Sequence, residues 1–287
     1  MTATASGGLR FVGRGRELGE LASWLAEAQA GRGRMAVLRG EPGIGKTRLA
    51  EELAELAAAA GIPTAWGRCS ADSGAPPLWP VRRVIDQLPG EHEPSYAVDP
   101  DGFGSSADGM AAARFAQFVW LADAVVAAAE ANGLLVVFED LHWADSATGA
   151  ALGHLAAELG RSRALVVVTA RPRAETEHGE MVALLDRPGV EQRNLSGLDR
   201  NAIADYLSAI SGGRVDERYA DLVLAQTAGN SLYVAAVSRL LAEHVSLRSY
   251  DAVESRAALA GRPELLDLSR EPMGRVSARC RAMVEFA

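Results

Sequence analysis

The feature that most constrains the fold is a glycine-rich segment that fits the pattern GxxxxGK[ST] without a mismatch. Its residues are Gly40, Glu41, Pro42, Gly43, Ile44, Gly45, Lys46 and Thr47. An apolar run at 35–38 precedes it and predicts a buried strand, and leucines at helical spacing follow it to about Ala60. The order of strand, glycine-rich loop and helix predicts an α/β fold of the P-loop NTPase type, with a parallel sheet flanked by helices.

This composition suits a loop that wraps a polyphosphate with successive backbone N–H groups at the start of a helix. Glycines allow the backbone to approach the phosphates, and the helix dipole favours negative charge at that end. By position in the pattern, Lys46 reaches the β and γ phosphates and the Thr47 hydroxyl is a magnesium ligand. A chance match to the whole pattern is the alternative, and the composition of the chain makes it rare.

The lysine of this pattern is also the single lysine of the chain, because every other basic residue is arginine. An ammonium group is a compact point charge on a flexible stem, whereas a guanidinium is planar and rigid. A sequence that uses arginine everywhere else therefore retains lysine where the two differ chemically.

A second apolar run, 134–138, predicts a strand covered on both faces, and two acids, Glu139 and Asp140, follow it directly. This arrangement resembles a Walker B segment. Glu139 is the expected acid on the metal side and Asp140 the acid that orients or deprotonates the attacking water. Two solvated acids after a core strand are the alternative. The order is the reverse of the usual Asp-Glu pair and Asp140 is one methylene shorter, so slow hydrolysis is expected.

A third apolar run, 164–168, ends shortly before Arg171. Because the carboxyl ends of parallel strands gather at one edge, Arg171 is a candidate to contact the γ phosphate, the alternative being a surface arginine at the start of a loop. The segments Ala111 to Ala131 and Ser146 to Leu159 are expected crossover helices, the second capped by Asp145 or Ser146.

Composition and charge argue against several classes of protein that the motifs alone leave open. The net charge of −8 and pI near 5.3 argue against a large nucleic-acid surface, so no direct DNA binding is expected. The two cysteines lie far apart in sequence and indicate neither a disulfide framework nor a zinc site. No uninterrupted apolar stretch of membrane-spanning length and no signal-like N-terminus is present, so a cytoplasmic protein without membrane contact is expected.

Several segments together resemble one family, the regulatory P-loop ATPases of the STAND class, in particular the AAA-type ATPase domain of large LuxR-type bacterial transcriptional regulators. The resemblance covers about residues 10 to 245, and 139–145, Glu-Asp-Leu-His-Trp-Ala-Asp, is its most specific element. The other matching segments are Phe11-Val12-Gly13-Arg14, the loop from Gly40 through Arg48, Gly67-Arg68-Cys69, 75–80 and Gly229-Asn230.

The resemblance implies ATP or ADP with Mg²⁺ as ligands, held by the loop through Arg48, and Val12 and Arg14 placed near the adenine. It also implies a helical subdomain that closes over the nucleotide. Ser231 stands where the family usually has a proline close to the base, which puts that contact in doubt. Nucleotide-dependent self-association and a protein or inducer partner are further implications. His142 and Trp143 are read as packing residues rather than catalytic ones.

The expected organisation is a P-loop ATPase core at 1–195 with a mobile, Pro- and Gly-rich insertion at about 88–110, then a helical lid at 196–245. Helical periodicity at 201–211, 217–228 and 232–243 supports the lid. The final part, 246–287, is expected to be a tail with an amphipathic helix at 276–286. Family members usually continue into a winged helix, and this tail is a candidate remnant of it. The chain is then a naturally short ATPase, a truncated regulator or one piece of a split system, and the sequence leaves these three open.

Three functions remain open at this point. The first is a nucleotide-dependent signalling switch with slow ATP hydrolysis, acting in transcriptional regulation. The second is a general AAA-type ATPase that acts on nucleic acid or protein partners. The third is a small-molecule kinase built on the same loop. The acidic charge counts against the nucleic-acid form of the second, and no acceptor pocket for the third is visible in the sequence.

Overall fold

The computed structural model describes residues 11–70, 75–90, 107–172 and 189–260, together with Leu184 and Arg187; the side chains of 107–111, 256, 257 and 260 are not described. The chain divides into two compact units. The core unit consists of Arg16–Gly40 and Lys46–Asn194, and the helical unit of the residues up to Gly15, Glu41–Gly45 and the residues from Leu195.

The core unit is built on a five-stranded parallel sheet of order β2-β3-β4-β1-β5. Its strands are β1 (Arg34–Arg39), β2 (Thr64–Arg68), β3 (Leu134–Glu139), β4 (Ala164–Ala170) and β5 (Val190–Asn194). The central strands β3 and β4 are buried along their whole length, which explains their continuous apolar sequences. The chain therefore has the α/β P-loop NTPase fold that its sequence predicts.

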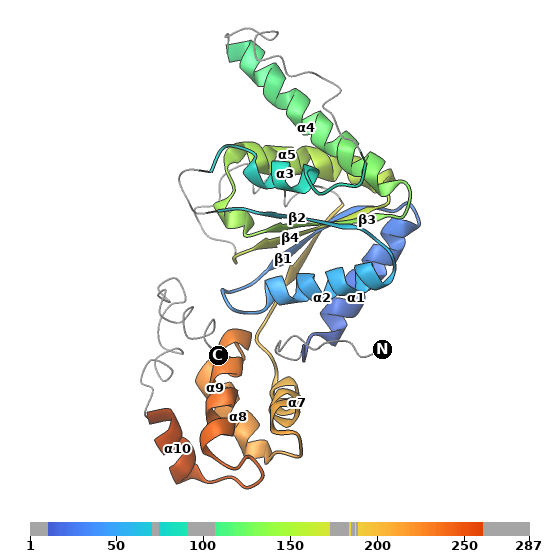
Figure 1. Ribbon diagram of the computed structural model, residues 1–287. Helices are drawn as coiled ribbons and strands as arrows, with labels where there is room; N and C mark the ends of the chain where they lie inside the picture. Colours follow the sequence, from blue (N-terminus) through green and yellow to red (C-terminus); the bar gives the residue numbers. More distant parts are fainter. Residues whose placement is uncertain are drawn as a thin grey trace. The chain divides into compact units, whose positions relative to one another are not determined.

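Helices cover both faces of this sheet (Figure 1). One face carries α1 (Gly15–Gln29) and α2 (Lys46–Ala59), and the other carries α3 (Trp79–Ile85), α4 (Ala107–Ala129) and α5 (Ser146–Glu158). Short 3-10 turns at Leu141–Trp143 and Leu159–Arg161 flank α5. The carboxyl ends of β1, β3 and β4 lie at one edge of the sheet because the strands are parallel, and the candidate site residues follow those ends.

The expected strands at 35–38, 134–138 and 164–168 are present, and the expected crossover helix at 146–159 is α5. Its N-cap is Asp145, whose side chain accepts a hydrogen bond from the Thr148 backbone N–H at 3.0 Å. The other crossover helix, α4, begins at Ala107, so the last residues of the segment expected as an insertion are helical. Residues 91–106 of that segment, and the helix expected at 276–286, lie outside the described residues.

Among the described residues, one helix is long and apolar enough to cross a membrane by length and composition alone. It is α4, in the window Ala112–Ala129, of which 39% is buried inside the protein. Leu121, Val125 and Ala129 of this window belong to the hydrophobic core that also contains β3 and α5 residues. The apolar character of α4 is therefore used for packing in the core unit.

The helical unit contains α7 (Arg200–Ser211), α8 (Glu217–Thr227), α9 (Ser231–His244) and α10 (Ala252–Ala260), which pack around a separate hydrophobic cluster. The first three match the helices expected from periodicity, whereas α10 was not anticipated. Aspartates cap α7 and α8: Asp199 accepts from the Ala202 N–H and Asp216 from the Arg218 N–H.

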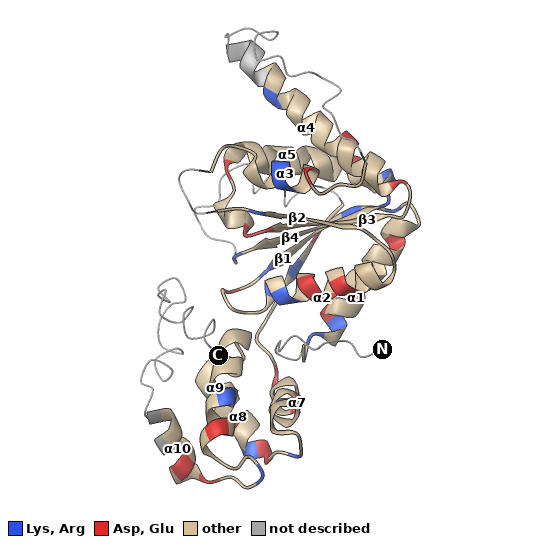
Figure 2. Cartoon of the chain, in the orientation of Figure 1, with Lys and Arg blue, Asp and Glu red and all other residues tan. Residues whose placement is uncertain are grey.

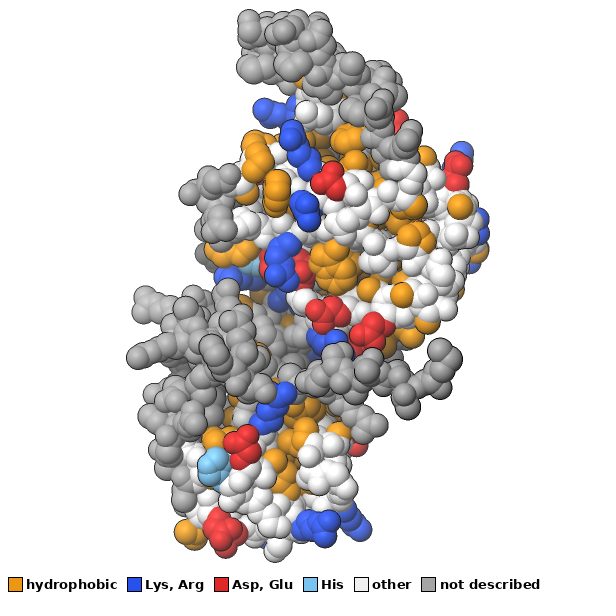
Figure 3. Space-filling model, viewed as in Figure 1, with side chains coloured by type: hydrophobic (Ala, Val, Ile, Leu, Met, Phe, Trp, Pro, Cys, Tyr) orange, Lys and Arg blue, Asp and Glu red, His pale blue; other side chains and the backbone are white. Residues whose placement is uncertain are grey.

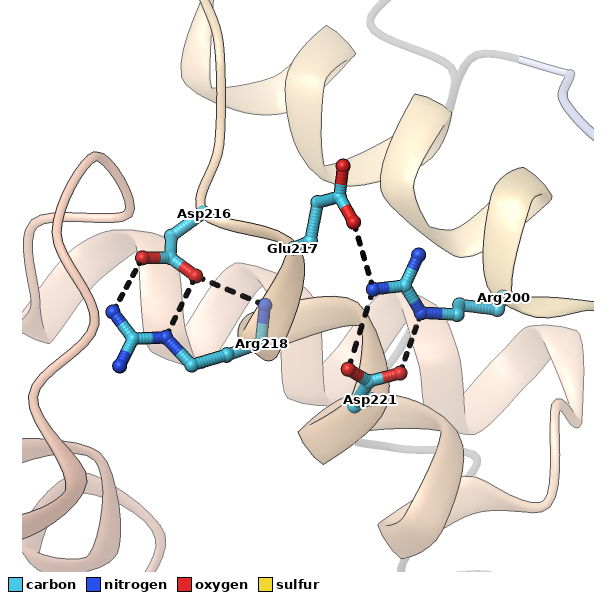
Figure 4. A network of polar contacts seen from close by, with 5 residues as sticks. All are labelled: Arg200, Asp216, Glu217, Arg218 and Asp221. Carbon is cyan, nitrogen blue, oxygen red and sulfur yellow. Dashed lines mark hydrogen bonds and ion pairs between the residues drawn. The ribbon is translucent and has the colours of Figure 1, made fainter.

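Ion pairs on the surface of the helical unit link α7 to α8 (Figure 4). Arg200 of α7 contacts Asp221 at 2.6 Å and Glu217 at 3.0 Å, and Arg218 contacts Asp216 at 2.7 Å. Most of these groups are exposed, and exposed pairs contribute little to stability. Arg200 joins the two helices, whereas the Arg218–Asp216 pair lies at the start of α8.

Candidate nucleotide-binding site

Within the helical unit, the middle of the glycine-rich loop is held by the start of α9. The Asn230 side-chain amide donates to the Pro42 carbonyl at 2.9 Å, the Leu232 N–H to the Gly43 carbonyl at 3.0 Å, and the Ser231 hydroxyl to the Ile44 carbonyl at 3.0 Å. Three successive carbonyls of the loop are thus occupied, and within the loop the Ile44 N–H donates to the Glu41 carbonyl at 3.2 Å.

Glycine is required in this loop by its backbone conformation. Gly43 has φ +76° and Gly45 has φ +99°, a region that L-residues with side chains rarely adopt. A Cβ on Gly43 would also lie 2.9 Å from the Asn230 Oδ1 and from the Leu232 Cβ. The close approach of α9 therefore adds a second reason for glycine at this position.

The two residues that the family resemblance assigned to the adenine region also belong to the helical unit. Arg14 is buried and donates from Nη2 to the carbonyls of Ile44, at 3.0 Å, and of Ser196. Val12 packs against the hydrophobic cluster of the helices. Arg14 thus braces the loop from a second side, and its contact with a nucleotide remains a prediction.

In the core unit, Lys46 begins α2 and donates from Nζ to the Gly40 carbonyl at 2.7 Å. Its side chain is buried, beyond the end of β1. The ammonium group is consequently held close to the loop backbone, where it can also reach a phosphate oxygen. This placement fits the role predicted for Lys46.

Thr47 and Arg68 both hold the carboxylate of Glu139, one on each oxygen. The Thr47 hydroxyl donates to Oε1 at 2.6 Å, and Arg68 donates to Oε2 from Nε at 2.9 Å and from Nη2 at 2.6 Å. The Trp66 indole N–H also donates to Oε2, at 3.0 Å. Glu139 is almost fully buried, so these contacts compensate the desolvation of its charge.

The same oxygens fit a magnesium ion. Mg²⁺ prefers hard oxygen ligands, retains several waters, and is usually bound by one or two protein groups together with substrate phosphates. The Thr47 hydroxyl and the Glu139 Oε1 supply this sparse set at the end of β3. Among the described residues, no group of three or more His, Cys, Asp or Glu side chains forms a separate metal cage.

Asp140 has a left-handed backbone conformation, φ 57° and ψ 44°, and its N–H donates to the Thr169 hydroxyl at 3.0 Å. Non-glycine residues in this region are uncommon and cluster at functional sites. Burial raises the pKa of the Asp140 carboxyl, and the neighbouring Glu139 charge raises it further, against the opposing effect of Arg68, Lys46 and Arg171. A carboxylate with a raised pKa is a stronger base towards water.

Arg171 lies over Trp143, with its guanidinium carbon 5.3 Å from the ring centroid. Trp143 is partly exposed and its ring is 5.1 Å from that of His142. Burial lowers the pKa of His142 to about 4, and the positive charges of Arg171 and Lys46 contribute. His142 is therefore neutral at physiological pH, and within the described part of the chain its ring nitrogens have no hydrogen-bond partner.

Arg48, which ends the matching loop segment, contacts three acids of its own helix. Its guanidinium lies 3.3 Å from Glu51 and 3.9 Å from Glu55 and also pairs with Glu52. Figure 2 shows these charges of both signs along α2. The nucleotide contact predicted for Arg48 would have to compete with these pairs.

Sequence reasoning missed the roles of Arg68 and Trp66 around Glu139. Gly67-Arg68-Cys69 was noted only as part of the resemblance. The missing element was β2: because Arg68 pairs with Glu139 in the parallel register of β2 and β3, it lies at the same sheet edge. An arginine at the end of a short strand after the glycine-rich loop was the available signal.

Comparison with protein-family models matches residues 10–168 to the AAA ATPase domain. The match covers more than half of the chain and includes the glycine-rich loop and the Glu139-Asp140 pair. This chain belongs to the AAA ATPase domain family. Membership of this family supports nucleotide binding by the domain. None of the curated proteins matches the sequence.

Solved structures similar to this AAA ATPase domain share the fold at low sequence identity. A Walker-type ATPase of Pyrococcus abyssi has a TM-score of 0.54 and 14% identity, over 94% of this chain and 77% of the other. A Signal Transduction ATPase with Numerous Domains (STAND) protein with a tetratricopeptide repeat sensor, from Pyrococcus horikoshii, has a TM-score of 0.50 and 19% identity, over 88% of this chain and 32% of the other.

The Aeropyrum pernix ORC1 protein, solved in complex with DNA, has a TM-score of 0.51 and 15% identity, over 88% of this chain and 66% of the other. The present chain thus spans about a third of the STAND protein, 32%, and just under two thirds of ORC1. At these identities the likeness concerns the fold alone.

Proposed function

We propose that this AAA ATPase domain is a cytoplasmic regulatory switch that binds ATP with Mg²⁺, hydrolyses it slowly, and acts in transcriptional regulation of the LuxR-type kind. The observation that carries the switch is the bonding of three successive loop carbonyls, Pro42, Gly43 and Ile44, by the start of α9. A loop whose backbone is tied to a helix transmits any change that a phosphate imposes on it.

In the proposed site, Lys46 binds the β and γ phosphates and the loop N–H groups surround them. Thr47 and Glu139 hold magnesium, which neutralises phosphate charge when bound. Asp140 orients and deprotonates the attacking water, and Arg171 contacts the γ phosphate after leaving Trp143.

Slow hydrolysis follows from the acid pair. The Asp140 side chain is one methylene shorter than the glutamate usual at its position, so its carboxylate extends less far towards the attacking water. The longer acid of the pair, Glu139, is on the metal side. A switch benefits from this arrangement because a long-lived ATP state gives a partner time to bind. The partner, which we propose to be a protein or an inducer, then responds to the state of the helices α7 to α9.

The first test is the nucleotide content of the purified chain. The protein is purified without added nucleotide and denatured, and the released nucleotides are separated by ion-exchange chromatography, with Lys46→Ala as the control. We expect near-stoichiometric ADP from the wild type and none from Lys46→Ala. No nucleotide from either chain, together with an ATP Kd above about 1 mM by calorimetry, would remove the ADP-held resting state.

The second test addresses the switch itself. Backbone hydrogen exchange of α9 is measured without nucleotide, with ADP, and with a non-hydrolysable ATP analogue and Mg²⁺. Protection at 230–235 that differs between the ADP and ATP-analogue states supports the switch. Identical exchange in both nucleotide states, with binding demonstrated, would leave an ATPase without coupling to its helices.

A further inference from the structure

A pocket of about 490 Å³ opens in the core unit where β2 ends. It is lined by Glu51, Trp66, Arg68, Trp79, Arg83 and Glu139, contributed by α2, β2, α3 and β3. Its volume lies within the range of small-ligand sites, about 300–1,000 Å³. Neither the phosphate-binding residues nor Asp140 line this pocket.

Two arginines, Arg68 and Arg83, line the pocket. Arg68 uses Nε and Nη2 for Glu139, while its side chain is 63% exposed. Arg83 is 53% exposed; its ion pair with Asp86 is long, 3.9 Å, and its guanidinium lies 5.8 Å from the Trp79 ring. Each guanidinium therefore has N–H groups that a further anion can accept from.

The acids of the lining limit the charge that the pocket can take. Glu139 is compensated by Arg68, Trp66 and Thr47, and Glu51 is 3.3 Å from Arg48. Both acids still repel a multiply charged anion. A single carboxylate can pair with Arg83, whose contact with Asp86 is long, and can share Arg68 with Glu139. The partly exposed Trp79 ring adds a flat apolar wall.

We propose that this pocket binds a carboxylate attached to a flat apolar group, held by Arg68 and Arg83 with the apolar part against Trp79. Basic residues on α3 are visible in Figure 2, and Figure 3 shows basic, acidic and hydrophobic side chains next to one another on the exposed face of the core unit. The carboxylate comes from a free small molecule or from an acidic side chain beside an aromatic one in a partner protein.

The pocket shares Arg68 with the candidate magnesium site, so the two sites are coupled. A carboxylate bound to Arg68 weakens the attraction between Arg68 and Glu139. The negative charge of Glu139 is then less compensated, and Glu139 attracts a divalent cation more strongly. Occupation of the pocket should therefore tighten binding of Mg²⁺-ATP, and Mg²⁺-ATP should tighten binding in the pocket by the same factor. This coupling rests on the proposed function, whereas the pocket itself does not.

The probe is 3-phenylpropionate, titrated into the nucleotide-free full chain and followed by ligand-observed NMR. Its neutral amide, 3-phenylpropanamide, is the matched control ligand, and Arg82→Gln is the matched control variant, because Arg82 is an exposed arginine of α3 that does not line the pocket. A fragment of this size should bind with a Kd on the order of 1 mM.

We expect saturable binding of the carboxylate to wild type and to Arg82→Gln, at least about fivefold weaker binding to Arg83→Gln and Trp79→Ala, and weaker binding of the amide. No saturation below about 20 mM, equal binding of the amide, or equal effects of Arg82→Gln and Arg83→Gln would overturn the site. Circular dichroism of each variant establishes that it is folded.

Two further experiments identify the source of the carboxylate and test the coupling between the pocket and the Mg²⁺-ATP site. A blocked peptide containing Phe-Asp that binds more tightly than the free acid indicates a protein source, and the reverse order a small molecule. Repeating the titration with Mg²⁺ and a non-hydrolysable ATP analogue tests the coupling. Probe binding that is unchanged by bound nucleotide would overturn the coupling and leave the pocket intact.

Discussion

Thr47 and Glu139 are joined by a hydrogen bond of 2.6 Å from the threonine hydroxyl to Oε1 of the carboxylate. The bond ties the first turn of α2 to the last residue of β3, so the two elements that a P-loop ATPase needs at its metal are already in register. Arg68 occupies the other oxygen of the same carboxylate. Glu139 is therefore both a candidate metal-side acid and the centre of a local polar network.

Replacing Glu139 should remove the part of ATP affinity that depends on magnesium. In Glu139→Gln the single amide oxygen can accept from Thr47 or from Arg68 and Trp66, but not from both sides, and the negative charge is lost. We expect a weakening of Mg²⁺-ATP binding by roughly tenfold, about 1.4 kcal/mol. Calorimetric titration with Mg²⁺ and with EDTA measures the difference. Glu158→Gln, at an exposed glutamate that ends α5, is the control. An equal loss with and without Mg²⁺ would argue for a purely structural Glu139.

Asp140→Asn should retain nucleotide binding and abolish hydrolysis, because the amide cannot take a proton from water. Asparagine tolerates the left-handed backbone at this position, so the variant should fold. In the wild type, burial and Glu139 raise the Asp140 pKa, and hydrolysis should increase as pH rises through that raised pKa. Phosphate release across pH measures both effects, and a variant that still turns over would exclude Asp140 as the base.

The same pKa shift has a stability consequence of definite sign. A carboxyl whose pKa is raised on folding binds its proton more tightly in the folded state, so its contribution to stability is present at low pH and is lost as pH rises through the folded-state pKa. Asp140→Asn should thus stabilise the chain at neutral pH relative to wild type. Urea unfolding at pH 4 and pH 7.5 should show the gain only at the higher pH.

The start of α9 should matter for both stability and nucleotide binding. Asn230 caps α9 through the Leu232 N–H and also bonds the Pro42 carbonyl, so Asn230→Ala should cost about 1–3 kcal/mol and loosen the loop. Ser231→Pro places proline at the first helical position, where it is tolerated, and removes only the bond to Ile44. Chemical denaturation and ADP titration should rank Asn230→Ala as the more damaging change.

Gly67 allows α3 to pack directly on β2. A Cβ on Gly67 would lie 2.4 Å from the Pro80 carbonyl oxygen and 3.0 Å from the Val84 Cγ2, so Gly67→Ala should destabilise the core unit by roughly 1–3 kcal/mol. At Gly19 in α1, an added Cβ would meet no atom within 4 Å, and Gly19→Ala should stabilise by about 0.5–1 kcal/mol. Thermal unfolding of the two variants checks the packing: Tm should fall in Gly67→Ala and rise in Gly19→Ala.

Much of the candidate site follows from local sequence. The glycine-rich loop contains Gly43 and Gly45 at positions whose φ values exclude most side chains, and Lys46 is the first residue of α2. The acids after β3 were predicted from an apolar run whose complete burial forced a central strand. The nucleotide and metal roles of the candidate site residues remain predictions; these residues are Val12, Arg14, the loop from Gly40 to Arg48, Glu139, Asp140 and Arg171.

What the sequence by itself determined is therefore the order of elements and the residues that chemistry requires at strand ends, since apolar periodicity and glycine geometry act over a few neighbouring residues. Only the tertiary structure decided that Arg68 and Trp66 share Glu139, and that Asn230 and Arg14 brace the loop. The separations involved, 71 residues between Arg68 and Glu139 and 188 between Asn230 and Pro42, explain this. Such partners are chosen by strand register and helix packing, which no local pattern encodes.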